Sequence, residues 1–133
     1  MSVSQDFIAF LNTQTTITAL VGDRICQAPA HVNEQLPYIV FMRQGRTQEL
    51  DLSGTKDNDH TFLDVECRGK TQDEAEQVGD ALQTLLHGYR GTWGNRRIQG
   101  VFCTDQSNDY VQLPPGSNDH EEVISTNVEI ISE

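Results

Sequence analysis

The sequence has 133 residues, the size of one domain, and its net charge of −11 argues against duplex nucleic acid, another polyanion, as a partner. No apolar run approaches the ~20 residues needed to cross a bilayer, and no basic region precedes the apolar part of the N-terminus. We therefore expect a single soluble, unsecreted domain over residues 1–133 that binds neither membranes nor specific nucleic acid sequences.

Two short helices are predicted at the N-terminus. Apolar residues at helical spacing follow Ser4, and a serine side chain can cap a helix by accepting a hydrogen bond from its free backbone N–H groups. A second helix is expected from Thr15 or Thr16 to Gly22, because glycine readily adopts the left-handed conformation of a helix end. The DRICQ that follows is short enough for an edge strand.

Two strands and a connecting segment come next. Residues 36–44, LPYIVFMRQ, predict a central strand covered on both faces, because the apolar run is unbroken and Pro37 stands at its start. Residues 45–59 are mostly polar and contain two glycines, which predicts a long loop or a protruding hairpin. Residues 61–69 alternate between apolar and polar side chains and therefore predict a strand with one buried face.

The clearest helix is predicted from Thr71 to His87. Thr71 and Glu74 match a T-x-x-E capping box, and an apolar stripe follows at helical spacing. The helix ends in LLHGYRG, whose polar residues raise the question of a phosphate-binding corner. Phosphates bind at helix N-termini, where N–H groups are unpaired, so this C-terminal position instead predicts a helix stop at Gly88 with Tyr89 folded back.

The C-terminal third predicts strands and little else. After a turn at GTWGN, strand patterns cover residues 96–103, 108–113 and 121–131. The predicted fold is an α+β domain, in which an antiparallel sheet of about four or five strands carries the 71–87 helix and the N-terminal helices on one face.

No linear signature of a catalytic centre or a metal site occurs in the sequence. The four histidines are too far apart for the paired spacing of a zinc site, and the common nucleotide-binding and hydrolase motifs are missing. The three cysteines are odd in number and widely spaced, which predicts reduced thiols, with Cys67 and Cys103 inside strands. We assign no catalytic, cofactor-binding or metal-binding residue. A small enzyme or ligand-binding domain is kept as an alternative, because a site assembled from distant residues escapes a linear scan.

Charge is distributed unevenly along the chain. Arg90, Arg96 and Arg97 form an arginine cluster, whereas no Lys or Arg occurs from Ile98 to the C-terminus. The basic and acidic parts could meet across a subunit boundary, or both could be solvated surface.

The order and spacing of three segments resemble those of the tail completion proteins of long-tailed bacteriophages and prophages, relatives of the tail terminator proteins. The segments are ITALVGDRI at 17–25, LPYIVF at 36–41 and FLDVECRGKTQDEAEQVGDALQTLLHGYRG at 62–91. The resemblance implies an α+β subunit that forms a ring, commonly of six copies, on the head-proximal end of the tail tube. There it stops tube polymerisation and joins the tail to the head without any catalytic residue.

The same resemblance implies the partners and the location. The partners are further copies of the chain, the major tail tube protein and the head–tail connector protein. The locations are the tail or neck of the virion and, during assembly, the cytoplasm of the bacterial host. Another neck component, such as a head-closure or connector-adaptor protein, would share most of these features.

Six residues are candidates for subunit or partner contacts. They are Arg90, Arg96 and Arg97 of the arginine cluster and Arg46, Glu49 and Asp51 of the 45–59 segment. We expect this segment to project toward a partner or the lumen, and the edge of the last strand to be able to pair with a neighbour. The alternative is that the arginines are exposed and contact nothing, since surface charges often contribute little.

Overall fold

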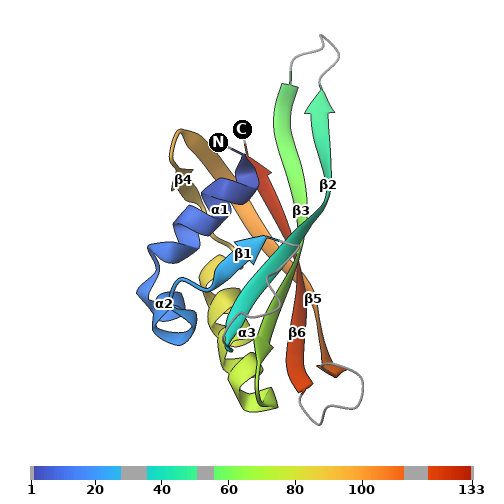
Figure 1. Cartoon of the computed structure of the whole chain (residues 1–133). Helices are drawn as coiled ribbons and strands as arrows, with labels where there is room; N and C mark the ends of the chain where they lie inside the picture. Colours follow the sequence, from blue (N-terminus) through green and yellow to red (C-terminus); the bar gives the residue numbers. More distant parts are fainter. Residues whose placement is uncertain (1, 28–35, 51–55, 113–119, 133) are drawn as a thin grey trace.

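The computed structural model describes residues 2–27, 36–50, 56–112 and 120–132, and it shows three helices on one side of a six-stranded sheet (Figure 1). The helices are α1 (Val3–Asn12), α2 (Thr15–Val21) and α3 (Gln72–Leu86). The strands are β1 (Ile25–Gln27), β2 (Tyr38–Leu50), β3 (Lys56–Gly69), β4 (Gly91–Trp93), β5 (Arg96–Gln112) and β6 (His120–Ser132). Their order in the sheet is β1-β2-β3-β6-β5-β4. The expectation that the last strand offers an edge to a neighbour is therefore wrong, because β6 pairs with β3 on one side and with β5 on the other. The α+β class is confirmed.

The sheet has more strands than the four or five predicted, and it is not wholly antiparallel. β4 forms inside the segment predicted as a turn, because Gly94 at φ +62° reverses the chain tightly enough for Trp93 to pair with Arg96. β1 pairs with β2 in parallel. The two strands predicted at 96–103 and 108–113 are one strand, since β5 absorbs an irregularity at Asp105 and continues its pairing with β6.

The core lies between the helices and one face of the sheet. The largest fully buried side chains include Phe7, Leu11, Phe41, Leu63, Leu82, Leu86 and Ile130. The Phe7 ring of α1 meets the Phe41 ring of β2 edge to face, with 5.1 Å between the centroids. The apolar stripe of α3 lies against β3 and β6, as its spacing predicted.

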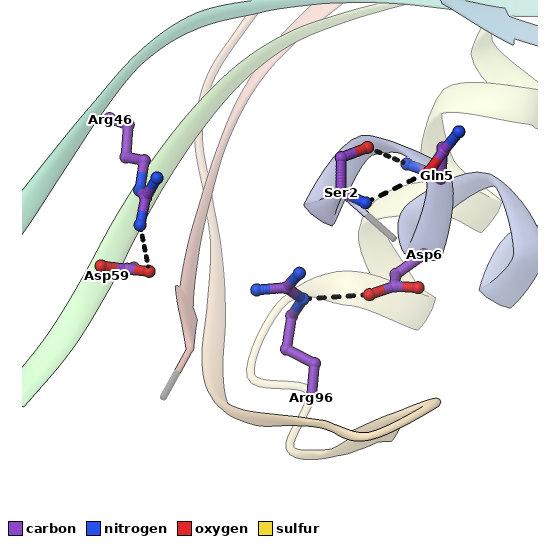
Figure 2. Close-up of polar contacts among 6 residues, drawn as sticks. All are labelled: Ser2, Gln5, Asp6, Arg46, Asp59 and Arg96. Atoms are coloured by element: carbon purple, nitrogen blue, oxygen red, sulfur yellow. Dashed lines mark hydrogen bonds and ion pairs between the residues drawn. The ribbon is translucent and has the colours of Figure 1, made fainter.

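The helix caps are only partly as predicted. Ser2 rather than Ser4 caps α1: the Ser2 hydroxyl accepts from the Gln5 N–H, and the Gln5 side-chain oxygen accepts from the Ser2 N–H (Figure 2). Ser2 is the better cap because Gln5 follows it at the three-residue spacing of a capping box, whereas Ser4 has Phe7 at that spacing. At α3, the Thr71 hydroxyl accepts from the Glu74 N–H as expected, but the Glu74 carboxylate accepts from the Lys70 N–H rather than that of Thr71, so the predicted capping box is only half formed.

The 45–59 segment belongs to a protruding hairpin. β2 and β3 continue as a two-stranded ladder beyond the helices, and their pairing extends to Leu50 and Lys56 (Figure 1). The prediction that β2 is covered on both faces holds only for its first half. Val40 and Phe41 are buried on opposite faces, whereas the side chain of Met42 is 56% exposed.

Two glycines of β2 and β3 offer a test of the packing. A Cβ at Gly69 would lie 2.7 Å from the backbone N of Ala75 at the start of α3, so the backbone would have to move. We expect Gly69→Ala to lower the free energy of unfolding by about 1–3 kcal/mol, as overpacking does. Urea denaturation measures this change.

Gly45→Ala is the matched control, because a Cβ at Gly45 would meet nothing within 4 Å. Its unfolding free energy should stay within about 0.5 kcal/mol of the original. Equal effects of the two substitutions would contradict the close contact between β3 and α3.

Candidate functional site

The LLHGYRG segment is a helix stop, as predicted. Gly88 has φ +83° after the end of α3, and its N–H donates to the Val101 carbonyl of β5. The His87 Nδ1 accepts from the Cys103 N–H at 3.1 Å. His87 and Gly88 thus bind the outer edge of β5, and this histidine satisfies a strand backbone group.

Tyr89 belongs to an aromatic cluster that joins α1 to β4. Its ring lies 4.7 Å from that of Phe10 and 6.0 Å from that of Trp93, while Phe10 stacks on Trp93 at 5.0 Å. The sequence predicted that Tyr89 would fold back, and its N–H does donate to the Leu86 carbonyl. The partners of its ring were missed, because they come from elements distant in the sequence.

The structure separates the arginine cluster. The Arg96 Nε donates to the Asp6 carboxylate of α1 at 3.0 Å, with both side chains largely buried (Figure 2). Arg90 and Arg97 are exposed and, with Thr92 and Gln99, line a concavity of about 500 Å³. Successive residues of a strand point to opposite faces, so Arg96 faces the helices and Arg97 faces away.

The other three candidate contacts lie in the β2–β3 hairpin. The Arg46 guanidinium pairs with the Asp59 carboxylate across the hairpin at 2.7 Å (Figure 2). The Glu49 side chain and the whole of Asp51 lie outside the part of the chain that the structure describes. Arg46 therefore has a partner within its own hairpin, and contact of these residues with another protein stays a prediction.

The face of the sheet opposite the helices has a closed half. Tyr38, Val40, Glu66, Arg68 and Val123 lie in two adjacent rows across β2, β3 and β6. The Arg68 guanidinium pairs with Glu66 at 2.6 Å and lies 6.0 Å from the centre of the Tyr38 ring. In this half, Val40 is only 5% and Val123 only 3% exposed.

The other half of this face is open, and we call it the open patch. It comprises Met42, Phe62, Asp64, Phe102, Asn127 and Glu129, placed in two rows by the strand register. Met42 and Phe102, at 56% and 42% exposure, are the large apolar side chains that stand out among the described residues. A cavity of about 350 Å³ lies between the strands' side chains, lined by Gly45, Phe62, Thr104, Asn127 and Glu129 among others.

The open patch carries a carboxylate without a charge partner. Glu129 pairs with the His60 Nδ1 at 2.7 Å, but Asp64 makes no hydrogen bond or ion pair with any described residue. Burial, and then the nearby Glu66 carboxylate, raise the pKa of Asp64 above its ordinary value. From the sequence, residues 61–69 were predicted only to form a strand with one buried face, and Asp64 lies on the other face. The missed signal is the exposed Met42 that lies directly opposite it.

The cysteines fit the prediction of reduced, structural thiols. All three are free, and Cys67 and Cys103 are buried. Burial raises the pKa of the Cys67 thiol to about 12 and that of the Cys103 thiol to about 11. Within the described ranges, no group of three or more metal-ligating side chains occurs, and no helix is long and apolar enough to cross a membrane.

Fold and surfaces together define a small α+β protein whose sheet carries helices on one face and an open apolar patch on the other. The chain belongs to the family of the tail completion protein gp17, whose family model matches residues 5–115. Membership of this family gives it a structural role in the tail or neck of a phage virion.

Solved structures support the fold assignment. A chain from the virion of a native gene transfer agent particle matches with a TM-score of 0.66 and 11% identity, over 95% of this chain and 92% of that chain. A second solved chain matches with a TM-score of 0.50 and 18% identity, over 96% and 89% of the two chains. No curated protein matches the sequence.

The separation of the arginines makes a prediction about stability. Arg96→Gln should lower the free energy of unfolding by about 1 kcal/mol, because it leaves the Asp6 carboxylate without its ion pair. Arg90→Gln should leave it unchanged, since Arg90 is exposed and pairs with no described residue. Thermal unfolding of both variants measures the difference, and equal stabilities would show that the Arg96 pair does not hold α1.

The thiols make a second prediction. At pH 8 the native protein should react with a thiol reagent at Cys26 well before Cys67 and Cys103, whose raised pKa values keep them protonated and whose burial blocks access. Unfolding returns both pKa values to the ordinary range, so all three thiols should then react quickly. Mass spectrometry of labelled peptides identifies the order, and early labelling of Cys67 would show that β3 opens readily.

Proposed function

We propose that this chain caps the head-proximal end of a phage tail tube as a closed ring, of six copies by the family's common pattern, and joins the tail to the head. The observation that carries the proposal is the family match over residues 5–115. The likeness in fold to a chain from the virion of a gene transfer agent particle supports it.

The mechanism is geometric. A cyclic ring requires that each subunit present two different and mutually complementary surfaces, so that every joint is the same and no growing edge remains. This subunit carries two distinct surfaces outside its core, the open patch and the concavity beside Arg90 and Arg97. No step needs a catalytic group.

The proposed partners are further copies of the chain, the major tail tube protein and the head–tail connector protein. The β2–β3 hairpin is the element proposed to reach one of these partners or the lumen, because it extends beyond the helices (Figure 1). Within the hairpin, Arg46 of β2 pairs with Asp59 of β3. The chain would act in the virion neck after assembly in the host cytoplasm.

Electron microscopy of purified protein mixed with tail tubes, and separately with portal-bound heads, tests this function. We expect density at one end of the tubes only, and tubes mixed with the protein during polymerisation should stop growing. Binding to heads but not to tubes would instead identify a head-closure or connector-adaptor protein. Absence of binding to either would overturn the proposed role in the neck.

A further inference from the structure

Most of the cations that the structure describes are already engaged within the chain. The Arg24 Nε donates to the Pro37 carbonyl, while Arg46, Arg68 and Arg96 pair with carboxylates. Arg90 is exposed and has no such partner among the described residues. Arg43 is also exposed without such a partner in the described part of the chain, but only Arg90 has a second exposed arginine, Arg97, beside it in one concavity, which makes this surface locally basic in a chain with a net charge of −11.

Arg90, Thr92 and Arg97, which we call the basic corner, lie on the helix-free side of the sheet at its β4 edge. Trp93 and Ile98 are buried in the core, so alternation along β4 and β5 turns Thr92 and Arg97 the other way. The three residues line one concavity of about 500 Å³. The basic corner is therefore a recess with positive rims rather than a flat surface.

The basic corner cannot reach Asp64, the carboxylate of the open patch, within its own chain. Asp64 is in register with Asn127 of β6, which pairs with Thr104 of β5. Arg97 lies seven residues before Thr104, which corresponds to roughly 23 Å along the strand at ~3.3 Å per residue. A positive recess and an apolar patch with an unpaired carboxylate are thus complementary but held apart, so only a second copy can bring them together.

We propose that the open patch of one copy receives the basic corner of the next copy, with Asp64 facing Arg90 and Arg97 and with Met42 and Phe102 packed against the neighbour. This inference rests on the proposed ring and names its two joining surfaces. The two surfaces differ, as the two sides of each joint in a cyclic ring must.

Each part of the open patch has a separate role in this joint. Met42 and Phe102 bound a patch four strands across, about 15 Å wide at ~4.8 Å per strand, and burying them supplies the attraction. Asp64 and the arginines select the orientation, because a like charge in either position would be repelled. The closed half contributes little, since its apolar side chains are already covered.

Charge exchange tests the pairing. Asp64→Arg alone, and Arg90→Asp with Arg97→Asp in another chain, should each weaken self-association by about tenfold or more, because each puts like charges face to face. Mixing the two variants should restore association, since each surface then meets an opposite charge in an alternating assembly. One chain that carries all three substitutions should associate like the original protein.

Asp80→Arg is the matched control, because Asp80 is an exposed carboxylate on α3, on the other side of the sheet. It should leave association unchanged. Sedimentation velocity over a range of concentrations measures association, and thermal unfolding checks that each variant is folded. If the original protein sediments as a monomer, the same set is scored by electron microscopy as rings at tail-tube ends.

A steric variant tests the same surface without changing charge. A Cβ at Gly45 points into open space beside the cavity of the open patch, so Gly45→Trp should block the neighbour while the subunit stays folded. Gly45→Ala should not block it. Full assembly of Gly45→Trp, or no recovery on mixing the charge variants, would overturn the inference.

The outcomes separate the inference from the proposed function. If the original protein caps tail tubes and every variant does so equally well, the pairing of surfaces fails and the capping function stands. If the protein ignores tail tubes but self-associates with the expected charge dependence, the function fails and the pairing stands. A protein that neither self-associates nor binds tubes overturns both.

Discussion

Everything in this structure depends on which face of the sheet the helices cover. Along β3, Leu63, Val65 and Cys67 alternate with charged residues, and β6 presents its matching apolar face beside them. A shift of one residue in this pairing would turn the apolar set toward solvent, so the burial of α3 fixes the register. Because the three helices cover only one face, the apolar side chains on the opposite face must be covered in another way or stay exposed to solvent.

The two halves of the opposite face differ in how far their apolar side chains are buried. In the closed half, Arg68 lies over Tyr38 and pairs with Glu66, so that a charged side chain shields apolar neighbours while its head stays satisfied. In the open patch, Met42 stays 56% exposed, and Phe102 stays 42% exposed although the His87 ring meets its ring edge to face at 6.3 Å. Exposed apolar patches of this kind mark interaction surfaces, and the open patch is the surface that we propose a neighbouring copy covers.

The fold could be predicted where its causes are local. The Thr71 cap, the apolar stripe of α3, the stop at Gly88 and the alternation of β3 all lie within a few residues of the pattern that indicates them. β4 was not predicted, because its pairing depends on the turn at Gly94, whose φ the sequence does not specify. The parallel pairing of β1 with β2 was not predicted, because the pattern of three residues does not indicate whether a strand pairs in parallel or antiparallel.

The surfaces were harder to predict than the fold, because they depend on contacts between distant residues. The aromatic cluster brings Phe10 of α1 to Tyr89 and Trp93, and Asp6 reaches Arg96 across 90 positions of sequence. The open patch likewise joins β2, β3, β5 and β6. The class of function could be predicted from the family resemblance, which is read from the sequence alone. The residues proposed to form the subunit contacts follow only from the strand pairing, which places them side by side.

The separation of Arg96 from Arg97 shows why this matters for experiments on such a protein. In the sequence the two form one basic pair, and a charge reversal of both would be the natural test of a subunit contact. In the fold, successive residues of the strand point to opposite faces, so Arg96 pairs with Asp6 of α1 and Arg97 lies on the outer surface. Loss of assembly after a double reversal would therefore mix loss of stability with loss of contact, whereas Arg90 and Arg97 together alter the surface and leave the Asp6 pair intact.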